Sequence, residues 1–284
     1  MEKRKINVNN MDMVYEECGE NNEWTVVLLH GFCGSSRYWH KVCPLLSDKY
    51  RIIMPQLRGH GSTSAPNDGY SMEAMADDIL GLLDALSIEK VVMFGHSLGG
   101  YVTLAFADKY PKKLQGLGLI HSTALPDSED KKKKRQQDIR DISQHGIEEY
   151  VNKLIPNLFT KSKLKELHEE LTEIISIGME MSPKGAMKAL EGMLQRPDRS
   201  HVLTKANYPI LLVAGAQDDV ISPLETFSIT NENIIDSTFG YPHILENTFE
   251  DVAHMSLIEA PNQLSRMIAN YMKILYEKEE LRLV

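Results

Sequence analysis

One serine within a tight glycine motif is the strongest chemical signal in the 284-residue sequence. The motif is GHSLG at residues 95–99, with Ser97 at its centre and Gly100 directly after it. It follows the apolar run VVMF at residues 91–94 and precedes a helical pattern. A serine on a sharp strand-to-helix turn projects its hydroxyl above a sheet, and the neighbouring positions must be small because larger side chains would collide with the strand and the helix. We therefore expect Ser97 to act as a nucleophile.

A serine hydroxyl is a weak nucleophile at neutral pH, so Ser97 needs a general base, and that base needs an acid to orient it. For a serine on such a turn, the acid precedes the histidine in the chain. Asp218 follows the apolar run at residues 210–214 and is the candidate acid, with Asp219 beside it as a competitor. His254 is the candidate base. Together these residues predict acyl transfer through a covalent intermediate.

Short apolar runs must form the elements that position these residues. Each run is aliphatic or β-branched and bounded by Gly, Pro or His, which is typical of strands buried on both faces. The runs lie at residues 26–29, 51–54, 91–94, 117–120 and 210–214. Helical patterns at residues 72–86, with Ser71 as the cap, and at 98–110 alternate with them. The alternation predicts an α/β fold with a mostly parallel central sheet flanked by helices.

The alternation breaks in the middle of the chain. From residue 123 to residue 204 there is no convincing strand pattern, and charged helical stretches take its place. These stretches cover residues 127–143, 147–159, 162–177 and 183–194. A helical block between two sheet strands predicts an inserted helical cap, or lid. We therefore expect a core formed by residues 1–122 and 205–284 and a cap formed by residues 123–204.

Bulk properties narrow the classes of function. The formal net charge of −9 argues against general affinity for nucleic acid or anionic membranes. The three cysteines resemble no disulfide framework, so we expect a reducing, cytoplasmic compartment. We find no signal peptide, no run long enough to span a membrane and no metal-ligand pattern. We therefore expect no metal, no nucleic-acid partner and no membrane partner, and the oligomeric state stays open.

Taken together, the motifs resemble those of the α/β-hydrolase superfamily, in its lid-bearing, esterase-like branch. The resemblance covers nearly the whole chain. Any one motif is moderately specific, whereas all of them in this order are highly specific. The matching segments are HGF at 30–32, RGHGS at 58–62, GHSLG at 95–99, MLQRPD at 193–198, GxxD at 215–218, AHM at 253–255 and EAP at 259–261.

The resemblance implies a role for each residue that matches these motifs. Ser97 would attack the acyl carbon, and His254 would take up and return the proton. Asp218, which the GxxD spacing favours over its neighbour, would hold the histidine. Backbone N–H groups of Phe32 and Leu98 would form the oxyanion hole. The resemblance further implies a small-molecule, ester-like substrate and no cofactor.

Several residues depart from the family pattern or lie outside its motifs. Gln56 stands where the family usually has a structural aspartate, and residues 228–243 form a local insertion. The basic run KKKKR at residues 131–135 is flanked by acidic residues, and we expect it to be a solvated face of a cap helix. Cys33 is expected to be a passive neighbour of the oxyanion loop. His121 follows a strand, so it is either structural or faces the site.

Three functions stay open on the sequence alone. The first is hydrolysis of a small or medium carboxylic ester or thioester through an acyl-enzyme on Ser97. The second keeps the same triad but cleaves a C–C bond or acts as a perhydrolase. The third is a ligand-sensing signalling protein on a hydrolase scaffold, because a fold alone does not determine a function.

Overall fold

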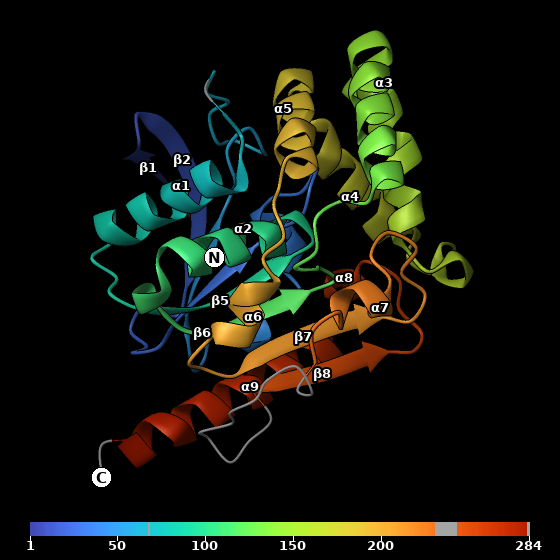
Figure 1. Ribbon diagram of the computed structural model, residues 1–284. Helices are drawn as coiled ribbons and strands as arrows, with labels where there is room; N and C mark the ends of the chain where they lie inside the picture. The colour runs from blue at the N-terminus through green and yellow to red at the C-terminus, as the bar shows by residue number, and fades with distance from the viewer. Residues whose placement is uncertain (68, 231–242, 283–284) are drawn as a thin grey trace.

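A single sheet forms the centre of the molecule. The computed structural model describes residues 1–67, 69–230 and 243–282 (Figure 1). Within this part, the strand order is β1-β2-β4-β3-β5-β6-β7-β8. β1 pairs antiparallel with β2, and β2 with β4, whereas the later pairings are parallel, so the mostly parallel sheet is confirmed. The strands are β1 (Glu2–Val8), β2 (Met11–Cys18), β3 (Thr25–Leu29), β4 (Arg51–Pro55), β5 (Val91–His96), β6 (Leu114–Ile120), β7 (Ile210–Gly215) and β8 (Ile244–Phe249).

The central strands coincide with the apolar runs, and the edge strands do not. Every residue of β3, β5 and β7 is buried, as expected for strands covered on both faces. The sequence did not predict β1, β2 or β8. β1 alternates exposed charged residues with less exposed ones, and β8 is buried mainly at its two ends. A search for continuous apolar runs misses such strands because edge strands are solvated on one side.

Helices pack against the faces of the sheet. Helix α1 (Met72–Ala85) begins after Ser71, whose hydroxyl accepts the Ala74 N–H at 3.2 Å, so the predicted cap is confirmed. Helix α2 (Leu98–Lys109) packs beside α1 and against β5 and β6 (Figure 1). The C-terminal helix α9 (Pro261–Arg282) places the Tyr271 ring 5.6 Å from the ring of Phe94 in β5. Two short helices, α7 (Pro223–Thr226) and α8 (Ser256–Glu259), lie in the loops after β7 and β8.

Between β6 and β7 the chain leaves the sheet and forms helices α3 to α6, which we call the inserted helices (Figure 1). They comprise α3 (Glu129–Leu154), η4 (Ile155–Leu158), η5 (Lys161–Lys163), α4 (His168–Met179), α5 (Pro183–Leu194) and α6 (Ser200–Lys205). The predicted bounds of α5 are confirmed. The two separate helices expected at 127–143 and 147–159 are confirmed as the two arms of α3, because the backbone between them is non-helical at Gly146, where φ is 84°.

All three cysteines lie in the described part of the chain, and two of them are joined. Cys18 of β2 forms a disulfide with Cys43 of η2 (Cys43–Leu45), whereas Cys33 is buried and free. The bridge was not expected from the number and spacing of the cysteines. The sequence has no sign of it because the sheet and the following loop, rather than a short spacing, bring the two residues together.

Two further sequence predictions meet the structure only in part. The insertion predicted at residues 228–243 lies mostly outside the described residues. Gln56, at the position of the family's aspartate, donates to the Ser36 hydroxyl at 3.0 Å and accepts the Ser62 N–H at 2.7 Å. It thereby holds the loop after β4. Among the helices that the structure describes, none has the length and apolar character needed to cross a membrane.

Candidate active site

Ser97 occupies the turn between β5 and α2 in a backbone conformation that side chains rarely adopt. Its φ is 50° and its ψ is −115°. The turn needs glycine on either side. A Cβ on Gly95 would lie under 3.0 Å from the backbone of Gly99, and a Cβ on Gly99 would lie 2.5 Å from the Leu29 carbonyl oxygen. The glycines of the motif therefore permit the close packing of β3, β5 and α2 that raises Ser97 above the sheet.

Asp218 and His254 lie against each other at the same edge of the sheet. Asp218 follows β7 and His254 lies in the loop after β8. His254 Nδ1 is 2.7 Å from Asp218 Oδ2, and both side chains are almost fully buried. A carboxylate oxygen only accepts, so Nδ1 carries the proton and Nε2 is the unprotonated nitrogen of the neutral ring. Asp219, the alternative acid in the sequence, instead lines a cavity.

The Asp218 carboxylate is held in its ionised form. Its second oxygen, Oδ1, accepts the N–H groups of Val220 and Ile221 at 2.8 and 2.9 Å. Burial alone would raise the pKa of the Asp218 carboxyl, but His254 and His121 beside it outweigh burial and keep that pKa well below its ordinary value. The carboxylate is thus an acceptor that orients a histidine without taking its proton.

A second histidine shares this carboxylate. His121 Nδ1 lies 3.3 Å from Asp218 Oδ2, so the interpretation in which His121 faces the site agrees with its position. Burial lowers the pKa of His121, and the ring is fully buried. His96 packs beside the turn, and its Nε2 lies 2.9 Å from the His254 carbonyl oxygen. Neutral imidazoles therefore surround the pair formed by Asp218 and His254.

Among the described residues, His121, Asp218 and His254 also have the spacing of a metal site, with one ligand atom each within 4.8 Å of the others. The hydrogen bonds that the ring Nδ1 atoms of His121 and His254 make to Asp218 Oδ2 also account for this closeness. All three side chains are buried, so an ion would have to displace both of these hydrogen bonds.

The two residues predicted to supply the oxyanion hole, Phe32 and Leu98, lie close to Ser97. Leu98 is the first residue of α2, and a helix has no acceptor of its own for its first N–H groups. Phe32 follows Gly31, where a Cβ would lie 3.3 Å from the Ser97 Cβ. The Phe32 ring packs edge-on against Tyr150 of α3, with 6.3 Å between ring centroids. Phe32 therefore joins the turn of Ser97 to the inserted helices.

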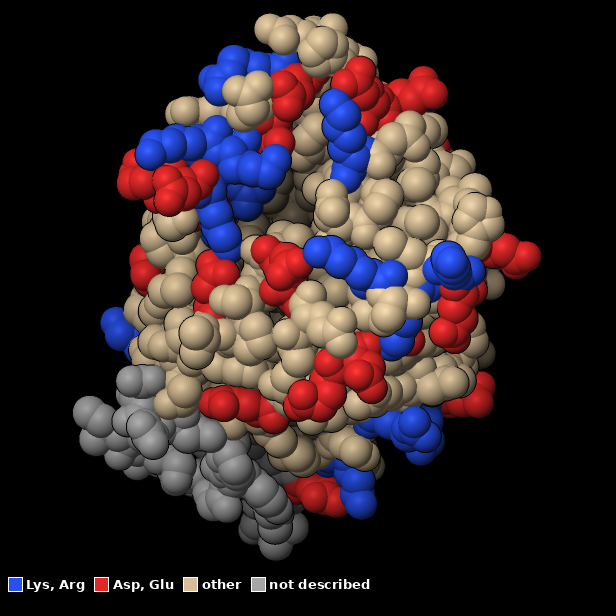
Figure 2. Space-filling model, turned by 90° about the vertical axis from the view of Figure 1, so that its right-hand side faces the viewer, with Lys and Arg blue, Asp and Glu red and all other residues tan. Residues whose placement is uncertain are grey.

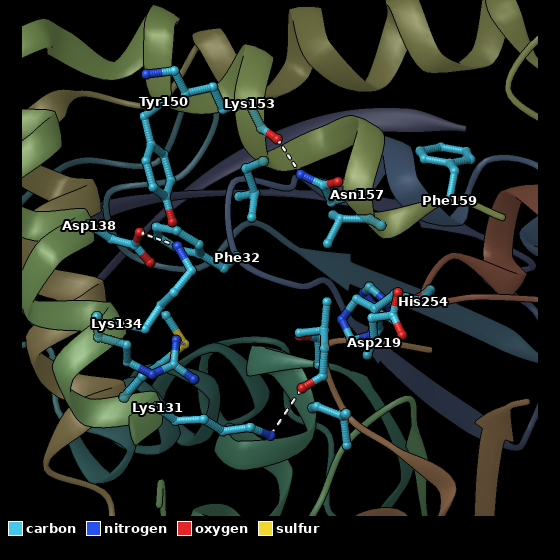
Figure 3. A pocket seen from close by; sticks show the side chains of 18 of the residues that line it. Phe32, Lys131, Lys134, Asp138, Tyr150, Lys153, Asn157, Phe159, Asp219 and His254 are labelled. Atoms are coloured by element: carbon cyan, nitrogen blue, oxygen red, sulfur yellow. Dashed lines mark hydrogen bonds and ion pairs between the residues drawn. The ribbon is translucent and has the colours of Figure 1, made fainter. Parts of the chain in front are cut away.

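A cavity of about 820 Å³ lies between the sheet edge and the inserted helices. It reaches Ser97 and His254 on the sheet side. Figure 3 shows His254 and Asp219 at one end and Lys134, Asp138 and Tyr150 of α3 at the other. The volume is that of a site for a small organic molecule.

The cavity also contains residues that the sequence interpretation missed. Within the basic run at residues 131–135, Lys131, Lys134 and Arg135 line the cavity. The predicted solvated face holds for Lys134, whose side chain is 76% exposed, but not for Arg135, whose side chain is only 18% exposed. The spacing of three and four residues places Lys131, Lys134 and Arg135 on one face of α3, and this periodicity was the signal available in the sequence. Lys132 and Lys133 pair instead with acidic residues of the preceding turn.

A mostly parallel sheet with a serine on the turn after a central strand is the architecture of the α/β hydrolases. The chain matches the alpha/beta hydrolase fold family over residues 25–261 and belongs to that family.

Relatives within this family act on different small molecules. A putative 2-succinyl-6-hydroxy-2,4-cyclohexadiene-1-carboxylate synthase of Bacillus subtilis is 31% identical over 212 residues, which cover 71% of this chain and 76% of the relative. The 3-oxoadipate enol-lactonase 2 of Acinetobacter baylyi is 24% identical over 264 residues, covering 91% and 92%. A malate-bound thermophilic esterase from Thermogutta terrifontis has a TM-score of 0.87 and 29% identity, covering 97% of this chain and 99% of its own.

Proposed function

We propose that the protein hydrolyses a small or medium carboxylic ester, thioester or lactone through an acyl-enzyme on Ser97. The observation that carries the proposal is the 2.7 Å contact between His254 Nδ1 and Asp218 Oδ2, in a cavity that also reaches Ser97. That contact fixes the tautomer in which Nε2 can accept a proton. The names of the enol-lactonase and the esterase among the relatives support the same class of reaction.

The proposed reaction gives each of these residues one role. Ser97 Oγ attacks the substrate carbonyl while His254 Nε2 takes its proton, and the Asp218 carboxylate stabilises the resulting imidazolium. The negative charge on the carbonyl oxygen is held by the N–H groups of Phe32 and Leu98, each worth about 3 kcal/mol of the barrier. His254 then protonates the leaving alcohol or thiol. A water molecule releases the acid from Ser97 by the same steps in reverse.

In this proposal the inserted helices, together with residues 123–204 as a whole, act as a cap over the site. Two contacts to the histidine loop support this role. The His254 N–H donates to the carbonyl oxygen of Leu158 in η4 at 2.9 Å. Glu259 accepts the N–H groups of Thr160 and Ala253 at 3.1 and 3.2 Å. A shift of the inserted helices would therefore disturb the catalytic histidine directly.

The first test measures hydrolysis of p-nitrophenyl esters from acetate to a long acyl chain by the wild type and by Ser97→Ala. We expect turnover that peaks at one chain length and a fall in kcat of about 10⁴- to 10⁶-fold in the variant. Cys33→Ala is the matched control, because it removes the buried, free thiol that directly follows Phe32 in the sequence. Turnover that survives Ser97→Ala would refute the proposal.

An alternative reaction keeps the triad but not the ester. The relative named as a synthase is the observation that favours it. Folded protein that turns over none of the esters, but cleaves a C–C bond in a Ser97-dependent manner, would establish this alternative. Tight binding of a small molecule without turnover would indicate the sensing role.

A cytoplasmic location stays a prediction. Counting free thiols in protein isolated under alkylating conditions tests it, because the Cys18–Cys43 bridge would leave one free thiol and a reduced protein would have three.

A further inference from the structure

The end of the cavity farthest from His254 is formed by one face of α3. Lys131, Lys134, Arg135 and Asp138 share this face and line the cavity. Figure 2 shows Lys and Arg side chains gathered beside a hollow on this side of the molecule. Among these residues Arg135 differs from the lysines, because its side chain is only 18% exposed.

One corner of the Arg135 guanidinium lacks a strong acceptor. Nε and Nη2 both donate to the Asp127 carboxylate, the latter at 3.2 Å. Nη1 instead donates to the thioether sulfur of Met193 at 3.4 Å, and Met193 also lines the cavity. A thioether is a weak acceptor. Nη1 is therefore the donor on Arg135 that gains most from an anionic ligand atom.

The carboxylate that pairs with Arg135 is shared with a second guanidinium. Arg196 Nη1 lies 2.7 Å from Asp127 Oδ1, and the side chains of Arg196 and Asp127 are 4% and 0% exposed. This group of two arginines and one aspartate carries a net positive charge away from solvent. Arg196 also donates to the neutral carbonyl oxygens of Met193 and Leu125 at 3.0 and 3.1 Å, so dipoles partly offset the excess charge. A ligand anion in the cavity would still be favoured over a neutral group.

The other charged side chains at this end are compensated or solvated. Lys134 pairs with Asp138 at 3.0 Å, and Lys131 pairs with Glu225 at 2.6 Å. The Asp130 side chain is 94% exposed. Asp219 lies at the opposite end of the cavity, beside His254 (Figure 3).

The rim of the cavity carries charges of both signs. Asp141 accepts from the neutral amide of Gln137 at 2.7 Å and keeps its negative charge. Lys153 and Lys161 add further positive charge to the cavity lining. The hydroxyl-bearing rings of Tyr101 and Tyr150 line the same cavity. Arg135 is thus a partly buried cation that a ligand in the cavity can reach.

We infer that Arg135 forms a subsite for a carboxylate, so that the substrate is an ester, thioester or lactone that carries a second, ionised carboxyl group away from the reacting carbonyl. This inference rests on the proposed function. The substrate carboxylate accepts from Nη1 in place of the Met193 sulfur, and it balances the single positive charge of the Asp127, Arg135 and Arg196 group. A neutral acyl chain offers Nη1 no acceptor.

The experiment measures binding, so that it does not depend on turnover. Ser97→Ala protein is titrated by calorimetry with the half methyl esters of succinic, glutaric and adipic acid, and with the matching dimethyl esters. We expect at least one half ester to bind about 10- to 100-fold more tightly than its diester. Adding Arg135→Gln should abolish this preference, and Arg135→Lys, which keeps the charge but not the planar fork, should retain part of it.

Lys133→Gln is the matched control, because it removes one positive charge from the same helix at a side chain that is 74% exposed. It should leave the preference unchanged. Equal binding of half esters and diesters in the parent, or a preference that survives in folded Arg135→Gln, overturns the inference. Absence of ester turnover in the wild type would instead refute the proposed function, while the binding comparison would still decide whether the carboxylate subsite exists.

Discussion

The sheet edge that carries Ser97 and the inserted helices above it are built in different ways. At the sheet edge, backbone clearances determine the structure, since added methyl groups at Gly95 or Gly99 would collide with neighbouring main chain. Besides the ionised Asp218, it holds buried histidines whose pKa values are lowered by burial, as at His30 and His96. In α3, by contrast, side-chain charges determine the structure, with ion pairs along the helix and to the core.

This difference separates the reaction from the choice of substrate. Backbone geometry leaves little room for variation, so the turn at Ser97 and its partners are positioned in the same way whatever the ligand. Side-chain charges on a helix surface can change without disturbing the main chain. We therefore expect substitutions at the sheet edge to affect stability and rate, and substitutions in the inserted helices to affect specificity. The following experiments test this division, in order of decreasing effect.

The largest contrast is expected between two adjacent aspartates. Asp218→Asn should lower kcat about 10⁴-fold, because an amide in place of the carboxylate favours the wrong tautomer of His254. Asp219→Asn should change kcat less than about threefold, since Asp219 lines the cavity but does not bond the histidine. Steady-state kinetics on the best p-nitrophenyl ester measures both. Similar losses in the two variants would show that the acid has been misassigned.

Two glycines compare the regions directly. Gly95→Ala places a Cβ against backbone atoms and should lower the free energy of unfolding by about 3 kcal/mol or more, with loss of activity. Gly146→Ala has nothing within 4 Å of its Cβ, so only its φ of 84° opposes the change. We expect a cost of about 1–2 kcal/mol and retained activity. Urea unfolding with activity assays distinguishes them, and equal costs would contradict the division between the regions.

A smaller effect concerns pH. His30 Nδ1 donates to the Gly31 carbonyl at 2.8 Å, and Nε2 accepts the Leu57 N–H at 3.0 Å. A second proton on the ring would bind at Nε2 and would face the Leu57 N–H, which is itself a donor. Burial, followed by the nearby His60, lowers the pKa of His30 from 6.5 to about 3. The unfolded chain binds this proton below about pH 6.5 and the folded chain does not, so stability is full above that pH and is lost as pH falls towards 3.

The measurement for this effect is the free energy of unfolding at pH 6.5 and pH 5.5. Each such histidine contributes a loss of at most about 1.4 kcal/mol over that interval. His30→Gln should reduce the difference between the two pH values by roughly this amount, whatever its own cost at neutral pH. An unchanged pH dependence would mean that His30 is not neutral in the folded protein.

The smallest effect is expected where α3 meets the core. Lys131 Nζ donates to Glu225 at 2.6 Å and to the Val220 carbonyl at 3.0 Å. Lys131→Met should cost less than about 1 kcal/mol, because the pair is partly solvated. It should nevertheless speed amide exchange in the first turns of α3. Lys133→Met, whose pair lies within the helix, is the control, and equal exchange in both variants would argue against a tether at Lys131.

Sequence reasoning succeeded where the chain repeats a strong local pattern. The central strands, the cap at Ser71 and the bounds of α5 all follow from apolar runs or from capping residues. The turn at Ser97 was predictable for a related reason, since only small residues fit beside it.

The features that were missed depend on contacts between distant segments. β1 and β8 lie at the two edges of the sheet and carry mixed polarity, and β2, which pairs with β1 and β4, interleaves charged residues with apolar ones. Two residues that surround the site, His121 and Arg135, could be assigned only once β6, β7 and α3 had been placed together. In the basic run at residues 131–135, the composition indicated exposure to solvent. The spacing of three and four residues instead placed Arg135 on the helix face that lines the cavity. Charge alone does not tell which side of a helix it lies on.

The bridge between Cys18 and Cys43 has a consequence for the oxyanion loop. It closes a covalent ring that contains β3 and Phe32, over a sequence separation of 25 residues. A ring of this size removes about 3 kcal/mol of conformational freedom from the unfolded chain. In the reduced protein, non-covalent contacts alone must hold the same loop beside Ser97. The conformational stability of the loop that contains Phe32 therefore depends on whether Cys18 and Cys43 are oxidised or reduced.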